Sequence, residues 1–271
     1  MKKLIPFLTL VVATTAQSQT LFDFESPTYS TGNLTTGPTS VTSGATFTGL
    51  NGWSQSGSGG PGAIVTTTSS GLYTGGQALG SGNSGNAYIG VNNNFALGNS
   101  FYFDLLAPVA NKGGVSGFAD LNSDSAVTYS SENGIFAGVL DSGGSSRFAF
   151  RDLAIGGSSY GSGVAANTTD WYRIYVTLDD STWTATMNVI NLTLGGTVVD
   201  LDPSTSATSF SHTWADGTGW IPTTSWTGTG ARASGTILID NITSTVPEPS
   251  AIAMLLVGGV GLLIHSRRQK D

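Results

Sequence analysis

The sequence predicts an all-β domain built as a two-sheet β-sandwich. Glycine is abundant, with 38 residues, and serine, threonine and asparagine occur throughout, whereas runs of strong helix formers are absent. Serine, threonine and asparagine compete with helical hydrogen bonds, and β-branched threonine and valine suit a pleated surface. Turn residues recur at the spacing of roughly 8–12 residues that is typical of all-β domains. Together these observations favour one large sandwich without internal helices.

Short apolar runs between the turn clusters mark the expected strands, and many of them alternate apolar and polar residues. This alternation is the pattern of a strand with one buried face. In chain order the clearest runs are LFDF at 21–24, AIVTTT at 63–68, SFYFDLL at 100–106, GIFAGVLD at 134–141 and RFAFRDLAI at 147–155.

Residues 171–192, WYRIYVTLDDSTWTATMNVINL, predict the clearest hairpin. A turn at residues 179–182 pairs apolar residues along one face, which is then buried consistently. The predicted pairs are Leu178 with Trp183, Val176 with Ala185, Ile174 with Met187 and Tyr172 with Val189. The outward face carries two aromatic residues, Trp171 and Tyr175. We interpret both as candidate glycan contacts, because an exposed ring can stack on the flat apolar face of a sugar.

The N-terminus differs from the body in composition. Two lysines open the chain, an apolar run follows from Leu4 to Ala13, and small residues stand at Ala16 and Ser18. A charged head, a short apolar core and a small-residue exit describe a secretory signal peptide. We therefore expect the protein to be exported.

The C-terminal segment combines three features in a fixed order. It begins with Val246, Pro247, Glu248 and Pro249, continues with a short apolar run, and reaches Arg267 and Arg268 near its end. The prolines exclude helix and hold Glu248 in extended chain. The apolar run is shorter than the about 17–25 residues of a stable helical anchor. The arginines keep their end on the cytoplasmic side of a membrane.

This arrangement resembles the PEP-CTERM sorting signal of Gram-negative bacteria. The resemblance implies a transient inner-membrane anchor, processing by an exosortase near the Pro-Glu-Pro motif, and a final place at the cell surface or in the extracellular matrix. It also implies association with exopolysaccharide. We divide the chain into a signal peptide with a signal helix at 1–18, a β-sandwich domain at 19–245, and a sorting signal with a short transmembrane helix at 246–271.

A looser resemblance concerns strand patterns in the body. The opening LFDFES, the later LNGWSQSG and the closing GTILIDNIT are similar to the first, an early and the last strand of concanavalin-like or carbohydrate-binding jelly rolls. The resemblance implies that the two ends of the domain pair as neighbouring strands, and it favours contact with glycans.

Charge and residue content exclude several classes of function. Only 10% of the residues are charged and the net charge is −7, which argues against nucleic acid, because its phosphates need clustered lysine and arginine. The absence of cysteine removes disulfides and thiolate metal sites. His212 is the one histidine of the body and is expected in a solvated loop without a nucleophile-elbow pattern. The closely spaced strand carboxylates of a glycosidase are also missing, so we assign no catalytic residue and expect no enzyme.

Three carboxylates form a candidate calcium site. Asp23 and Glu25 are two residues apart in the first expected strand and therefore share a face. Asp240 lies in the last expected strand. If these strands are neighbours, their oxygens converge, and clusters of hard oxygen ligands suit Ca²⁺. The alternative is that they are edge carboxylates, hydrogen-bonded to backbone or solvent. No other cofactor is required.

Two functions from different classes fit these features. The first is a structural or adhesive role at the cell surface or in the extracellular matrix, associated with exopolysaccharide after exosortase processing. The alternative is a glycan-binding jelly-roll module, and a degenerate polysaccharide hydrolase is a third interpretation. A glycan array distinguishes the first two.

Overall fold

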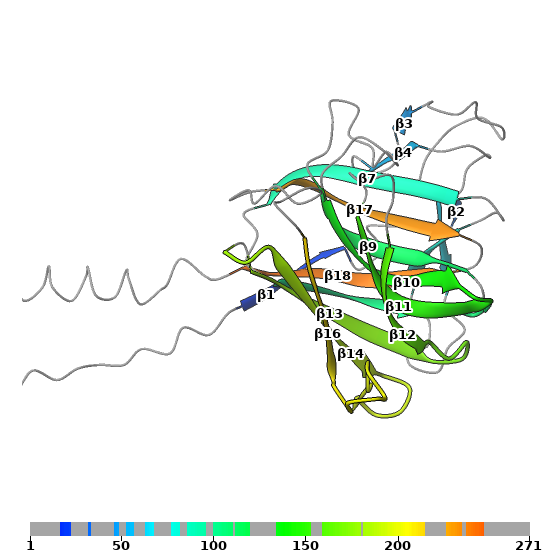
Figure 1. Ribbon diagram of the computed structural model, residues 1–271. Helices are drawn as coiled ribbons and strands as arrows, with labels where there is room; N and C mark the ends of the chain where they lie inside the picture. The colour runs from blue at the N-terminus through cyan, green and yellow to red at the C-terminus, as the bar shows by residue number, and fades with distance from the viewer. Residues whose placement is uncertain are drawn as a thin grey trace, which may run out of the picture.

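Two β-sheets pack face to face in the computed structural model of the chain (Figure 1). The structure describes residues 17–22, 32–33, 46–48, 53–56, 63–67, 77–81, 86–95, 100–110, 112–119, 134–152, 159–179, 181–214, 226–234 and 237–246. For these residues the predicted all-β, two-sheet sandwich is confirmed.

The larger sheet has ten strands in the order β15-β14-β13-β8-β18-β6-β5-β2, with β1 also paired to β18 and β16 also paired to β14. Their bounds are Gln17–Phe22 (β1), Gly32–Asn33 (β2), Ala63–Thr67 (β5), Gln77–Ser81 (β6), Ser100–Leu106 (β8), Trp171–Asp179 (β13), Thr184–Asn191 (β14), Thr197–Val198 (β15), Ser209–Thr213 (β16) and Leu238–Val246 (β18).

The smaller sheet has eight strands in the order β12-β11-β10-β9-β17-β7-β4-β3. Their bounds are Thr46–Thr48 (β3), Trp53–Ser56 (β4), Asn86–Phe95 (β7), Gly114–Ala119 (β9), Gly134–Ser142 (β10), Ser145–Asp152 (β11), Ser159–Ala165 (β12) and Trp226–Ser234 (β17).

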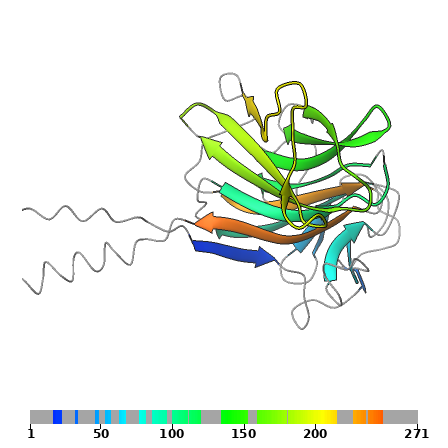
Figure 2. The ribbon, with the colours of Figure 1, turned by 90° about the horizontal axis from the view of Figure 1, so that it is seen from below.

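The two ends of the described chain lie side by side. Strand β1 pairs antiparallel with β18, and Gln17 is opposite Val246 (Figure 2). A pairing of the first and last strands was predicted, but the first strand was expected in LFDFES at 21–26, and only Leu21 and Phe22 of that run lie in β1. The observed pairing includes Gln17 and Ser18 of the expected signal peptide and Val246 of the expected sorting signal. The rest of the expected signal helix, at 1–16, and the expected transmembrane helix lie outside the described residues. Within the described residues no helix has the length and apolarity needed to span a membrane.

The β13–β14 hairpin keeps its predicted faces but not its predicted register. Leu178 pairs with Ala185, Val176 with Met187 and Ile174 with Val189, so the predicted pairing was wrong by two residues along β14. A shift of two residues leaves every side chain on its original face. The closing pair is Asp179 with Thr184, and Trp183 takes a positive φ of 58° in the turn instead of pairing with Leu178.

The core lies between the inner faces of the two sheets. Strands β8, β13 and β14 contribute Phe101, Phe103, Leu105, Ile174, Val176 and Met187, and strands β10 and β11 contribute Ile135, Val139, Phe148 and Phe150. All of these side chains are buried. Burial of one such side chain stabilises the fold by about 1.5–3 kcal/mol relative to exposure. Cross-sheet packing on this scale suits a chain without cysteine.

One open edge of the sandwich is closed by aromatic side chains. Tyr160 of β12 and His212 of β16 belong to different sheets, and their rings stack at 3.5 Å between centroids. The His212 ring also meets the buried Trp214 edge-on at 4.5 Å. His212 therefore lies half-buried in a strand, and its prediction as a solvated loop residue was wrong. The alternation in SFSHT turns Phe210 and His212 inward together.

Acid is expected to weaken this edge. Burial lowers the pKa of His212 from its ordinary value of 6.5. Below about pH 6.5 the unfolded chain binds a proton at this position more readily than the folded chain does, so the free energy of unfolding falls as the pH falls. Between about pH 7.5 and 5.5, the melting temperature should therefore drop more in the wild type than in His212→Gln. His265 is present in both proteins, so any contribution from it to the pH dependence is the same in the two. Equal pH slopes would contradict the role of His212.

Candidate functional site

The candidate site lies on the outer face of the ten-stranded sheet, where the neighbouring strands β8 and β13 form its centre. Alternation along each strand decides which side chains reach this face. Phe101, Phe103 and Leu105 of β8 point into the core, so Tyr102 and Asp104 point outward. In β13, Arg173 and Tyr175 point outward by the same argument.

Two tyrosines form the aromatic part of the site. Tyr102 and Tyr175 are direct cross-strand partners, with ring centroids 5.2 Å apart and planes tilted by 46°. Both side chains are half-buried. Their rings therefore keep part of their surface open, while the sheet holds them in place.

A charged pair lies beside the tyrosines. Arg173 Nε donates to Asp104 Oδ1 at 2.7 Å, and Arg173 Nη2 donates to Asp104 Oδ2 at 2.9 Å. The guanidinium also lies over the Tyr102 ring, with its carbon 4.7 Å from the centroid. The hydrogen bond to Asp104 raises the pKa of Arg173 above its ordinary value, although burial opposes the shift. The fork geometry and the aromatic contact fix the orientation of a side chain that is otherwise flexible.

A bulge in β18 completes the charged cluster. The register shifts between Asp240, which pairs with Asp104, and Thr243, which pairs with Tyr102. Asn241 stands in this bulge with a φ of 48°, a conformation that asparagine adopts more readily than most residues. Its side-chain Nδ2 donates to Asp104 Oδ2 at 2.9 Å. The bulge thus gives the buried carboxylate of Asp104 a second donor beside Arg173.

Hydroxyl groups extend the outer face toward the sheet edge. Thr184 and Thr213 lie 2.8 Å apart between hydroxyl oxygens, and so do Thr186 and Ser211. Asn188, the cross-strand partner of Tyr175, donates through Nδ2 to the Thr208 carbonyl at 3.1 Å. These exposed polar groups lie next to the tyrosines on a continuous surface.

The structure separates the two predicted glycan contacts. Tyr175 lies in the candidate site. Trp171 is 0% exposed, so its prediction as a surface contact was wrong. It stands at the start of β13, where its backbone N–H donates to the Thr193 hydroxyl and its carbonyl accepts from Leu192 N–H. The segment after β14 is thereby held against the Trp171 backbone, and alternation alone does not reveal such a contact.

The structure describes one of the three residues of the predicted calcium site, Asp240. Asp240 is buried opposite Asp104, and its Oδ1 accepts from the Asn241 backbone N–H at 2.8 Å. Asp23 and Glu25 lie outside the described residues. Among the residues that are described, no three histidine, cysteine or carboxylate side chains gather to hold a metal ion. The three-carboxylate site stays a prediction.

The predicted sorting residues also lie mostly outside the described part of the chain. Val246 is the last residue of β18. Pro247, Glu248, Pro249, Arg267 and Arg268 lie beyond it and are not described.

Sequence reasoning found Tyr175 but missed its partners Tyr102, Asp104 and Asn241. The alternation in SFYFDLL already indicates that Tyr102 and Asp104 point away from the core. It does not indicate which strand lies beside them. The pairing of β8 with β13 and β18 supplies that information.

No family model matches the sequence, and no curated protein matches it. Among solved structures, the chain is similar to lectin II from Ulex europaeus, with a TM-score of 0.47 and 11% identity over 75% of this chain and 99% of the lectin. It is also similar to the globular domain of calreticulin from T. cruzi, with a TM-score of 0.47 and 9% identity over 81% of this chain and 93% of that domain. A carbohydrate-binding module from Bacillus subtilis matches with a TM-score of 0.39 and 12% identity over 71% of this chain and 95% of the module. These likenesses concern the arrangement of strands, and the ligand has to be argued from the residues of this chain.

Proposed function

We propose that this protein is an exported, non-enzymatic glycan-binding β-sandwich that contacts sugar through the outer face of its ten-stranded sheet. The observation that carries the proposal is the pair of half-exposed tyrosines, Tyr102 and Tyr175, beside a guanidinium held by a buried carboxylate. Sugars offer apolar C–H faces and directional hydroxyls. A rigid aromatic surface with fixed polar groups at its margin is complementary to both.

Each part of the site has a separate task in this proposal. The tyrosine rings pack against the apolar face of a sugar ring. Arg173 donates two hydrogen bonds to Asp104, and these bonds fix the direction of its remaining N–H groups. The neighbouring hydroxyls of Thr184 and Thr186 extend the polar margin, so that a chain of several sugar units has further groups to contact.

Replacing Tyr102 or Tyr175 with Ala is expected to weaken glycan binding at least about tenfold, because truncation of a central aromatic contact removes much of the binding energy of an interface. The measurement is a glycan array with the wild type, followed by calorimetric titration of the strongest glycan into each variant. Tyr175→Phe keeps the ring and should retain most of the affinity. Val109→Ala removes an exposed apolar side chain elsewhere and should change nothing. Absence of binding to any glycan would reject the proposal.

Sorting to the cell surface forms the second part of the proposal. The order of the Pro-Glu-Pro motif, the apolar run and the arginines supports processing by an exosortase at the inner membrane. Strand β18 ends at Val246 and pairs with β8 as far as Thr245, so the last strand of the sheet ends directly before Pro247. The exported body would then reach the surface or the matrix, where polysaccharide is its partner. A structural or adhesive role follows from glycan binding at that place.

Replacing Glu248 with Ala is expected to leave the melting temperature unchanged and to retain the uncut protein in the inner membrane. Folding is unaffected because the motif follows the last strand, whereas processing depends on the motif itself. Cell fractionation and mass spectrometry of the C-terminus make the measurement. A mature surface protein that still ends at Asp271 would contradict processing.

A further inference from the structure

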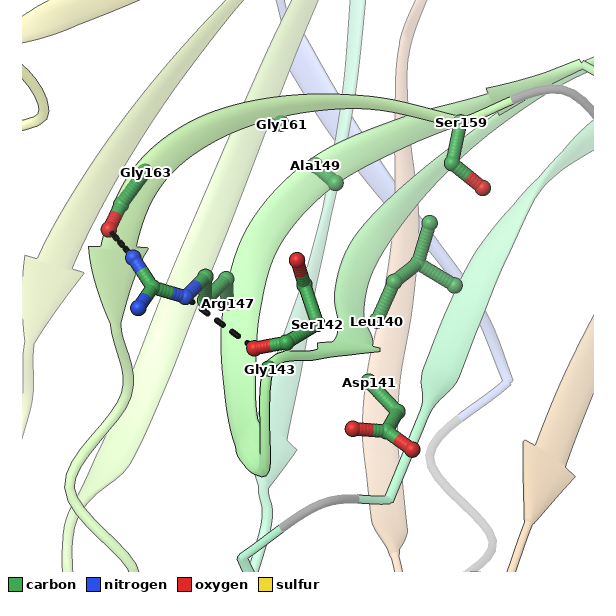
Figure 3. A pocket seen from close by; sticks show the side chains of 9 residues that line it. All are labelled: Leu140, Asp141, Ser142, Gly143, Arg147, Ala149, Ser159, Gly161 and Gly163. Carbon is green, nitrogen blue, oxygen red and sulfur yellow. Dashed lines mark hydrogen bonds between the residues drawn. The ribbon is translucent and has the colours of Figure 1, made fainter.

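A hollow of about 360 Å³ lies on the outer face of the eight-stranded sheet, on the opposite side of the sandwich from the tyrosines. Strands β10, β11 and β12 line it, and Figure 3 shows their residues around its rim. Its volume falls within the range of small-molecule pockets. The lining residues are Leu140, Asp141, Ser142, Gly143, Arg147, Ala149, Ser159, Gly161 and Gly163.

A bulge in the edge strand β12 opens this hollow. Ala149 of β11 pairs with Gly161, but Arg147 pairs with Ala165, so β12 has extra residues in between. Gly163 stands in the bulge with a φ of 83°, which glycine adopts without the strain of a side chain. Bulges at sheet edges commonly accompany binding sites, because they redirect the chain locally.

Arg147 lies at one end of the hollow and bridges β10 and β12. Its Nε donates to the Ser142 carbonyl at 3.2 Å, and its Nη1 donates to the Gly163 carbonyl (Figure 3). Both acceptors are neutral, so they fix the guanidinium without neutralising it. Asp141 points away from the Ser142 hydroxyl in Figure 3, as expected of the neighbouring residue in a strand.

The remaining lining suits a sugar ring. Ala149 and Gly161 leave the floor almost without side chains, and Leu140 offers an apolar wall. Ser142 and Ser159 supply hydroxyls that both donate and accept hydrogen bonds. A compact ligand with hydroxyls and one negative charge matches a hollow in which two carbonyls fix the Arg147 guanidinium and the Asp141 carboxylate points away from Ser142.

We propose that this hollow binds a carboxylate-bearing sugar, a uronic acid unit, with its carboxylate on Arg147 and its ring over Ala149 and Gly161. The hollow shares no residue with the candidate site around Tyr102 and Tyr175. Its proposed ligand is therefore tested independently of the proposed function. Because the two sites lie on opposite outer faces, one molecule could link two polysaccharide chains.

The test is calorimetric titration of the full chain with glucuronate, polygalacturonate, glucose and acetate. We expect both uronates to bind at least about tenfold more tightly than glucose, since the carboxylate–guanidinium contact is charge-assisted. Tighter binding of the polymer than of glucuronate would identify a polysaccharide chain as the natural source. Acetate binding as tight as that of glucuronate would overturn the assignment to a sugar, and no difference between glucuronate and glucose would overturn the role of Arg147.

Two variants test the site in different ways, so that the test does not depend on Arg147→Gln being able to fold. Arg147→Gln removes the charge but keeps an amide donor for the two carbonyls. Gly161→Leu fills the hollow and keeps the charge; a Cβ at Gly161 meets its nearest atoms at 3.8–4.0 Å, so the substitution has room. Each should weaken glucuronate binding at least about tenfold, while Lys112→Gln, with the same change in net charge outside the lining, should not. Unchanged binding in Gly161→Leu, with its melting temperature preserved, would overturn the proposal even if Arg147→Gln failed to fold.

Discussion

Replacing Ile174 with Ala is expected to lower the free energy of unfolding by about 2–5 kcal/mol. Ile174 is fully buried in the centre of β13, between Phe103 of β8 and Val189 of β14 in the sheet. The substitution removes apolar contacts and leaves a cavity, because close-packed neighbours relax only partly. Urea unfolding, analysed by linear extrapolation, measures the difference.

Thr177→Ala is the matched control for this experiment. Thr177 lies on the same strand but is exposed on the outer face. Its replacement should change stability by no more than about 0.5 kcal/mol, as is usual for surface substitutions. If the two variants were equally stable, the assignment of the faces of β13 would be wrong.

This hairpin illustrates what a local pattern determines. Alternation in WYRIYVTLD correctly predicted that Tyr172, Ile174, Val176 and Leu178 are buried. It could not determine the register, because every even shift buries the same face. Turn chemistry decided between the registers. Asp179 Oδ1 accepts from both the backbone N–H and the hydroxyl of Ser181, and these bonds stabilise a turn that the apolar pairing alone does not indicate.

The errors at Trp171 and His212 have a related cause. Trp171 follows the outward alternation of β13 yet is buried, and the segment after β14 returns to its backbone at this point. The Gly-rich sequence near His212 predicts a loop, yet His212 lies in a strand and pairs with Ala185 of β14. In both cases the decisive contact comes from another part of the chain, which periodicity does not describe.

The sequence could predict single residues of the candidate site but not how they come together. Each strand pattern gives its own outward residues, and Tyr175 was identified in this way. The cluster needs β8, β13 and β18 as neighbours, and these strands are far apart in sequence. Asn241 also needs the bulge in β18, which has no apolar pattern to mark it. Local sequence therefore predicts the surface chemistry of each strand, while the topology brings the residues together.

Replacing Arg173 with Met is expected to lower the free energy of unfolding by about 2–3 kcal/mol. Asp104 is 0% exposed, so it loses its cation without gaining water. Asp240 is buried directly opposite on β18, and like charges in this position repel. The loss should stay below that of a fully buried ion pair, because the Arg173 side chain is 28% exposed and the native pair is partly screened.

The reverse substitution, Asp104→Asn, should cost less than Arg173→Met, although both break the same pair. The Arg173 guanidinium is partly exposed and can turn to solvent, whereas the Asp104 carboxylate is buried and cannot. The amide oxygen introduced by Asp104→Asn would still accept from Asn241. Urea unfolding of the wild type and the two variants at neutral pH tests this order. Equal losses in the two variants would mean that Asp104 is hydrated in the folded protein and that the charged pair does not fix the orientation of the two tyrosines.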